Sequence, residues 1–307
     1  MFLESAIPKN NVPRAVFFMV LSAVLFGCMA IVIRLASKQL HAFEIAFFRN
    51  FFGFVFTAPL FFKHGIGILK TDKLHLYIGR CMIGIISMMC GFWAIVHLPL
   101  AEAVAISYST PLFVTILAVL FLGEVVGIRR WSAVLAGFIG VLIIMQPGSQ
   151  TFNADMMIAL MAAVMSGIVA ISIKVLSRTE KADAIVIFTT MLWVPMSLIP
   201  ALFVWEWPVG ITWLWIIAAG FFGTTAHLFW TRALKLGDAS MLTPISFFQV
   251  PVVAIGAWIV FDEKIGAMAF LGASIIFIAN AYIARREAQL ARRSVTDPDI
   301  NSGTQQR

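Results

Sequence analysis

The amino-acid sequence is divided into ten long apolar runs, and this pattern restricts the possible folds more than any other feature. A bilayer core about 30 Å thick is crossed by about 20 helical residues, because each residue rises about 1.5 Å. The runs therefore predict an all-α integral membrane protein with ten transmembrane helices. The predicted spans are residues 15–36, 42–62, 74–96, 102–122, 131–146, 154–174, 184–205, 212–234, 240–260 and 265–284.

The composition agrees with a membrane protein and excludes several other classes. Of the 307 residues, 61% are hydrophobic and only 12% are charged, whereas soluble domains have about 25% charged residues. The net charge of +7 does not indicate nucleic-acid binding, because the 22 Lys and Arg are scattered between apolar runs and form no patch. Cys28, Cys81 and Cys90 lie inside apolar runs without metal-ligand spacing, so we expect them to pack and we expect no metal or cofactor.

The distribution of basic residues predicts the orientation. With ten spans, 17 Lys and Arg lie on the side that holds both termini, and three, Arg34, Lys38 and Lys264, lie on the other. The positive-inside rule then places both termini in the cytoplasm of a bacterial cell, with the protein in the inner membrane. Residues 285–307 form a basic cytoplasmic tail, which we expect to be disordered from Ser294. Most tryptophans, Trp230 among them, lie near span ends, as in an interfacial belt.

The two halves of the chain repeat each other. The segment from Leu98 to Glu124 has an echo from Leu236 to Glu263, and the two glutamates are 139 positions apart. Each half, residues 15–146 and 154–284, then has five spans, so the second half must enter the membrane with opposite polarity. Inverted repeats of this kind are typical of secondary transporters, whose substrate site lies near the midplane between the repeats.

Several motifs resemble a known family. They are Phe43-Glu-Ile-Ala-Phe-Phe-Arg49, Arg80, Leu98-Pro-Leu-Ala-Glu-Ala103, Ser109-Thr-Pro-Leu-Phe113, Leu122-Gly-Glu124, Gly223-Thr-Thr-Ala-His227, Ala233 and Asp238-Ala-Ser240. Over residues 15–284 the chain resembles the EamA branch of the drug/metabolite transporter superfamily. The resemblance implies ten helices around a central cavity lined chiefly by the third, fourth, eighth and ninth. Members of this branch include amino-acid and metabolite exporters, riboflavin importers and S-adenosylmethionine importers.

Paired prolines indicate where the solute binds. Pro111 and Pro251 lie near the centres of the fourth and ninth spans, and each removes an amide donor, which leaves the carbonyls of Ser107 and Phe247 without their helical bond. Freed carbonyls at membrane depth must face protein or a water-filled cavity, although a packing kink is the alternative. The polar and aromatic side chains near these prolines, with His227, are the predicted substrate-binding residues: Tyr108, Ser109, Thr110, Pro111, Thr243, Phe247, Phe248, Gln249, Pro251 and His227.

Charged residues inside spans form a second group of candidates, with structural or gating roles. Arg49 and Arg80 are costly there, by about 3 kcal/mol at the centre of a span. Arg80 is close enough to the cytoplasmic end to snorkel, whereas for Arg49 we favour a structural ion pair over a substrate contact. Glu44 lies five residues before Arg49, about 140° around the helix, and is a poor partner for it.

These features predict a secondary transporter that works by alternating access and carries a small, polar, planar metabolite, riboflavin first and S-adenosylmethionine next. An amino-acid or metabolite exporter of the same superfamily is the alternative, and a channel or membrane scaffold the alternative from another class. No nucleophile with its base indicates an enzyme. Carboxylates within spans, Glu44, Glu102 and Asp155, lie only at outer ends, which leaves direction and coupling open. The expected partners are the solute and the lipid bilayer, with a homodimer as a further possibility.

Overall fold

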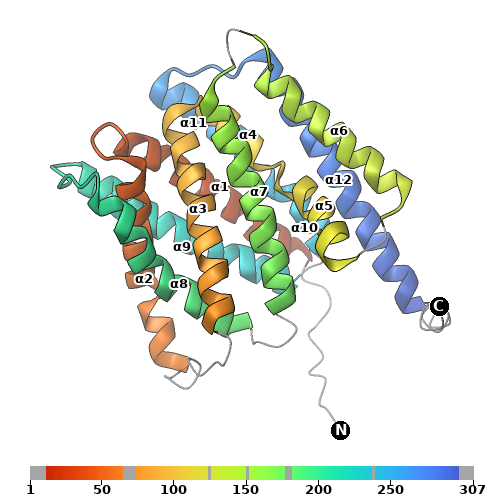
Figure 1. Ribbon diagram of the computed structural model, residues 1–307, viewed down its shortest axis with the longest axis horizontal. Helices are drawn as coiled ribbons and strands as arrows, with labels where there is room; N and C mark the ends of the chain where they lie inside the picture. The colour runs from red at the N-terminus through yellow and green to blue at the C-terminus, as the bar shows by residue number, and fades with distance from the viewer. Residues whose placement is uncertain are drawn as a thin grey trace.

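The computed structural model describes residues 12–64, 74–123, 126–149, 152–176, 182–236 and 239–296 (Figure 1). These residues form helices and connecting segments, and no strand is found among them. The helices are α1 (Val12–Ala36), α2 (Ala42–His64), α3 (Leu74–His97), α4 (Leu100–Ser107), α5 (Thr110–Leu122), α6 (Ile128–Met145), α7 (Ala154–Leu176), α8 (Ala182–Leu202), α9 (Thr212–Leu236), α10 (Ala239–Ser246), α11 (Gln249–Phe261) and α12 (Ala267–Thr296).

The helices follow the apolar runs of the sequence, but the fourth and ninth runs are each broken into two helices, α4 with α5 and α10 with α11. Within the described residues, eight segments are long and apolar enough to cross a bilayer, and the apolar part of α8, Phe188–Leu202, is shorter. The chain is therefore an all-helical, multi-pass membrane protein. The eight segments are Pro13–Ala36, Leu74–His97, Leu100–Leu122, Ile128–Met145, Ala154–Ile173, Thr212–Leu234, Pro244–Phe261 and Ala267–Arg285.

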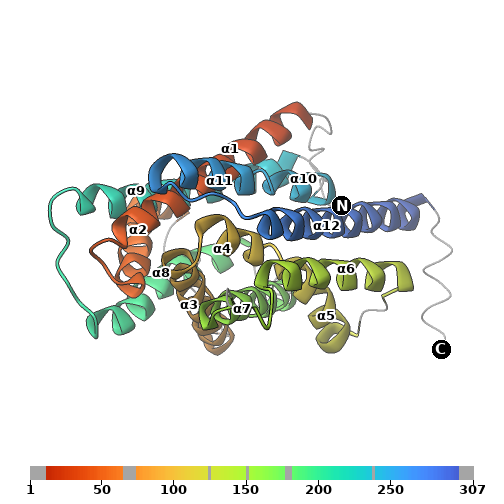
Figure 2. The same ribbon diagram turned by 90° about the horizontal axis from the view of Figure 1, so that it is seen from above.

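Helices from the two halves of the chain pack against each other in a reciprocal pattern. The first helix of one half lies along the third helix of the other, as α1 does along α9 and α7 along α3. In the same way α1 contacts α11 and α7 contacts α5, while α6 pairs with α12 and α2 with α8. Figures 1 and 2 both show α6 beside α12. Exchanging the two halves thus leaves this set of neighbours unchanged.

Close approach of α6 and α12 depends on two glycines. A Cβ atom at Gly140 would lie 2.8 Å from the carbonyl oxygen of Gly272, which no side chain tolerates. Small residues let membrane helices pack with their backbones close together, and this contact stabilises the junction of the two halves.

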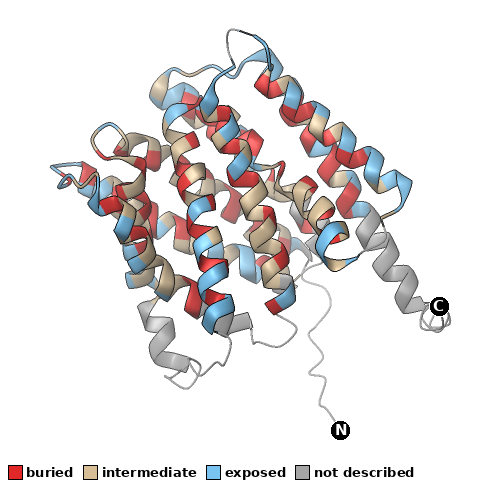
Figure 3. Ribbon diagram, viewed as in Figure 1, coloured by how far each residue is buried: buried red, intermediate tan, exposed pale blue. Residues whose placement is uncertain are grey.

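Exposed positions lie on the outer faces of the helices, while buried positions face the inside of the bundle (Figure 3). Phe121 is 72% exposed and Ile128 is 82% exposed, and many other large hydrophobic residues are exposed with them. Soluble monomers avoid apolar surfaces of this extent. The exposed apolar surface is the surface that lipid would cover.

At the C-terminal end, α12 continues through Thr296. Helix therefore includes Ser294, where disorder was expected to begin, and residues 297–307 lie outside the described part of the chain.

Candidate functional site

The two broken spans have matching geometry. Helix α4 ends at Ser107, and α5 begins at Thr110 with Pro111 in its first turn. Helix α10 ends at Ser246, and α11 begins at Gln249 with Pro251 in its first turn. Proline is favoured at the start of a helix, where its missing N–H costs nothing. Each proline therefore begins a new helix after a short non-helical turn.

The turns leave neither predicted carbonyl free, which corrects the expectation for Ser107 and Phe247. The Ser107 carbonyl accepts a hydrogen bond from Oγ1 of Thr110 at 2.8 Å. The Phe247 carbonyl accepts from the amide of Val250 at 2.9 Å. Local hydroxyl and turn bonds thus replace the helical bonds that the prolines remove.

Tyr108 connects the two breaks to each other. Its hydroxyl oxygen lies 2.5 Å from the Ser246 carbonyl oxygen, to which it donates, and 3.1 Å from Oε1 of Gln249. Its ring packs on Phe247 with 4.1 Å between centroids. Its carbonyl accepts a hydrogen bond from Nδ2 of Asn280 on α12 at 2.8 Å. One residue of the first half therefore holds the break of the second half in place.

Two cavities meet at these breaks. One, of about 330 Å³, is bounded by residues of α1, α9 and α12 together with the breaks. The other, of about 310 Å³, is bounded chiefly by α3, α4 and α7. Ser107, Thr110 and Gln249 line both cavities and therefore lie between them. Concave sites with a few polar groups in an apolar wall are typical of small-molecule binding.

The structure brings five of the ten predicted substrate-binding residues to this place. Tyr108, Thr110, Pro111, Phe247 and Gln249 line the cavity of about 330 Å³.

Other predicted residues lie elsewhere. Ser109 is buried and donates to the Ile106 carbonyl at 2.7 Å. Phe248 and Pro251 line a separate groove along α10, α11 and α12, where Phe248 is 48% exposed. The side chain of Thr243 is outside the described part of the structure.

Several cavity residues were not among the predicted substrate-binding residues. Ser22 and Phe26 of α1, Trp230 of α9 and Asn280 of α12 all line the cavity of about 330 Å³. Trp230, expected in the interfacial belt, borders this cavity as well. Asn280 could have been found by the reasoning used for Gln249, since its amide also stands in an apolar run. Ser22 and Phe26 carry no such signal.

Arg49 does not have the structural ion pair that was favoured for it. Its Nη1 donates to Oδ1 of Asn50 at 3.0 Å, and Nδ2 of Asn50 donates to Ser197 at 3.2 Å. Among the described residues no carboxylate pairs with Arg49. Glu44 instead accepts from the amides of His41, at 2.9 Å, and Glu206, at 2.5 Å. As predicted, Glu44 and Arg49 are not partners.

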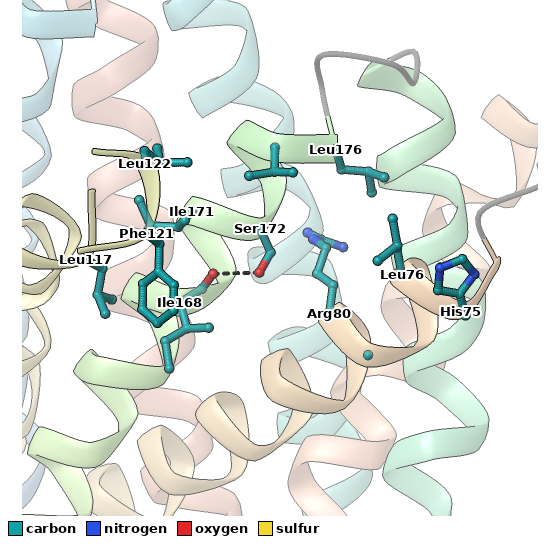
Figure 4. A pocket seen from close by; sticks show the side chains of 12 residues that line it. His75, Leu76, Arg80, Leu117, Phe121, Leu122, Ile168, Ile171, Ser172 and Leu176 are labelled. Atoms are coloured by element: carbon teal, nitrogen blue, oxygen red, sulfur yellow. Dashed lines mark hydrogen bonds between the residues drawn. The ribbon is translucent and has the colours of Figure 1, made fainter. Parts of the chain in front are cut away.

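Arg80 lies in a groove of about 680 Å³ between α3, α5 and α7 (Figure 4). The guanidinium is buried and its Nη1 donates to Oγ1 of Thr189 on α8, so the side chain does not snorkel to the membrane surface. Apolar side chains such as Leu117 and Phe121 form the opposite wall of the groove.

In the described part of the chain one ion pair is found, and it joins three segments at one end of the bundle. Nη2 of Arg34 lies 2.9 Å from Oε1 of Glu263, and Oε2 of Glu263 accepts from the amide of Leu100 at 2.9 Å. Nη1 of Arg34 also donates to the carbonyls of Ile95, Val96 and Leu98. Arg34, near the end of the first predicted span, thus fastens the end of α1 to the α3–α4 and α11–α12 connections.

Reciprocal halves of apolar helices, with cavities at matched helix breaks, define a multi-pass membrane transporter. The chain belongs to the EamA-like transporter family, whose model matches residues 13–146 and 154–285. The resemblance that the sequence motifs indicated is thereby confirmed.

Relatives and a solved structure agree with this family. The chain is 31% identical to a riboflavin transporter of Vibrio cholerae, over 73% of this chain and 76% of the relative. It is 29% identical to an S-adenosylmethionine uptake transporter of Rickettsia felis, over 83% of this chain and 87% of the relative. A crystal structure with 17% identity matches at a TM-score of 0.62 and covers 89% of this chain and 98% of that one, which shows the fold.

Proposed function

We propose that the protein is a secondary transporter that carries a flat, polar metabolite across the bacterial inner membrane by alternating access. The observation that carries this proposal is the pair of cavities that meet at Ser107, Thr110 and Gln249, between the two helix breaks. Aromatic residues supply apolar contact area and the amides and hydroxyls fix orientation. The names of the relatives make riboflavin and S-adenosylmethionine the two solutes to test.

The proposal includes ten membrane crossings in two inverted repeats, with both termini in the cytoplasm. The coincidence of the helices with ten apolar runs supports the number of crossings. The reciprocal packing of α1 on α9 and α7 on α3 supports the repeat. The excess of 17 basic residues over three supports the orientation.

In this topology the Arg34–Glu263 pair lies on the outer side of the membrane. It bridges α1 and the α11–α12 connection, so it holds the outer ends of the two halves together. Opening the cavities toward that side requires the pair to separate. Rocking of one half against the other is the movement that inverted repeats use for this purpose.

Counterflow in proteoliposomes tests the proposal. The purified protein is reconstituted with unlabelled solute inside, and uptake of labelled riboflavin or S-adenosylmethionine is followed over time. A carrier gives saturable uptake with a transient overshoot, whereas a channel gives neither. Uptake of neither solute above empty vesicles would point to an exporter of another metabolite, which a wider panel of solutes identifies.

Phe247→Ala and Phe248→Ala form a matched pair for the site itself. The two residues are neighbours in sequence, but only Phe247 lines the cavity of about 330 Å³, whereas both line the separate groove along α10–α12. We expect Phe247→Ala to reduce counterflow and Phe248→Ala to preserve it. The opposite result would move the solute to the groove along α10, α11 and α12.

A further inference from the structure

Arg49 is a cation inside the helix bundle, and none of the described residues supplies a charge that compensates it. Its Nη1 donates to Asn50, but Nε is buried and has no hydrogen-bond partner within the described residues. A buried charge without a partner costs several kcal/mol, so an arginine in a membrane span is normally paired or in use. No carboxylate among the described residues forms an ion pair with Arg49.

Three carboxylates within or near the spans are engaged elsewhere. Glu44 accepts from two backbone amides, Asp155 accepts from the indole of Trp93 at 2.8 Å, and Glu263 pairs with Arg34. An anion that compensates Arg49 in this structure would therefore have to come from outside the described chain.

The guanidinium of Arg49 lies beside Gly223 of α9. A Cβ atom at Gly223 would lie 2.9 Å from Nη2 and 3.0 Å from Nε of Arg49, and 2.8 Å from the sulfur of Met29. A side chain at this position would have to displace the guanidinium and the thioether. His227 follows one turn later on α9, close enough for its charge to interact with that of Arg49.

This group adjoins the solute cavity. The His227 ring meets the Phe26 ring edge-on with 5.0 Å between centroids. Phe26 lines the cavity of about 330 Å³, and so does Trp230, three residues after His227 and on the same helix face. His227 therefore adjoins the cavity wall to which Phe26 belongs, and Arg49 lies beside Gly223, one turn earlier on α9. Neither side chain is among the residues that line the cavity in this structure.

We infer that Arg49, with His227 beside it, binds a carboxylate group of the transported solute. A planar guanidinium binds a carboxylate through two parallel hydrogen bonds, which gives orientation as well as energy. The inference rests on the proposed function and narrows its substrate class to flat metabolites that carry a carboxylate. S-adenosylmethionine has such a group and riboflavin has none, so the site selects the former.

Counterflow of two solutes that differ only in this group tests the inference. Wild-type protein should carry S-adenosylmethionine at least about tenfold better than decarboxylated S-adenosylmethionine, as a charge-assisted hydrogen bond predicts. Arg49→Gln should lower counterflow of the carboxylate form at least about tenfold and change that of the decarboxylated form less than about twofold. Arg49→Lys should fall between wild type and Arg49→Gln.

Arg80→Gln is the matched control, because Arg80 is a second buried arginine and lies at a separate groove between α3, α5 and α7. It should affect both solutes alike. Equal loss of both solutes in Arg49→Gln would make Arg49 a structural residue and overturn the inference. A second measurement does not depend on the folding of that variant. The two unlabelled solutes are compared as competitors of labelled S-adenosylmethionine counterflow by the wild-type protein. Equal competition by both solutes would also overturn the inference.

The outcomes separate this inference from the proposed function. Saturable counterflow of riboflavin without any of S-adenosylmethionine overturns the carboxylate site and leaves the transporter. Absence of counterflow with every solute of the panel overturns the proposed function itself.

Discussion

Gln249 is the residue at which a substitution should affect the solute site most directly. It lines both cavities, and its Oε1 accepts a hydrogen bond from the Tyr108 hydroxyl. Gln249→Ala should reduce transport about tenfold, since a buried hydrogen bond with an unmet partner is worth about 1–3 kcal/mol. Counterflow is measured at matched protein content, with Phe248→Ala as the neighbouring control. Unchanged flux would make Gln249 a residue that only joins helices.

Gly223 offers a second test at this scale. Gly223→Ala should displace the guanidinium of Arg49, because the added Cβ would stand 2.9 Å from Nη2. We expect transport of carboxylate-bearing solutes to fall about fivefold or more, which corresponds to a loss of about 1 kcal/mol in binding free energy. The variant should still be present in the membrane at a normal level. Gly266→Ala is the control, because its Cβ would meet open space. An effect of equal size in both variants would refute this role of Gly223.

Side-chain direction at the breaks is where sequence reasoning was least effective. An amide or hydroxyl group within an apolar run indicates a polar contact inside the protein, so Tyr108 and Gln249 could be predicted as site residues. The short non-helical turn between α10 and α11 interrupts the helical period, and the direction of Phe248 relative to Phe247 then depends on the turn. For the same reason Ser109, next to two cavity residues, is buried against its own backbone.

Among the elements, the apolar runs predicted where helices lie, but not that two runs contain a break. A proline inside a run can kink one helix or begin another, and the choice depends on whether the freed groups find partners. Here the Tyr108 hydroxyl and the Asn280 amide, both far away in sequence, bind carbonyls at the turns. Such partners are known only when the fold is known.

In the proposed cycle the connection between α11 and α12 closes the outer side of the protein through Glu263, and this role can be tested. Glu263→Gln should weaken the closure of the outer side, because Arg34 loses its ionic partner and keeps only carbonyls. A partly exposed ion pair is worth about 1 kcal/mol, or about fivefold in the population of the open state. The measurement is the rate at which an impermeant thiol reagent labels Ser107→Cys, in a background without native cysteines, from the outer side. A rate that does not rise would contradict a closing role for the pair.

At the scale of the whole molecule, the positive-inside count makes a prediction about topology. Reporter fusions after Arg293 and within residues 63–73 should both read cytoplasmic, because 17 basic residues on that side oppose three on the other. A fusion at Lys264, in the connection before α12, serves as the control for the outer side. A periplasmic signal at either of the first two positions would refute the ten-crossing arrangement.

The homodimer stays a prediction, which cross-linking of the protein in membranes would test.

The bond between Tyr108 and Ser246 has a consequence for the cell's energy economy. One phenol links the two breaks, so a movement that separates them must break its hydrogen bond to the Ser246 carbonyl. A membrane protein with a hollow interior would short-circuit the ion gradients that drive the cell whenever both of its ends admitted water. In the proposed cycle a state open at both ends would have to part the two breaks, so this bond disfavours the leak.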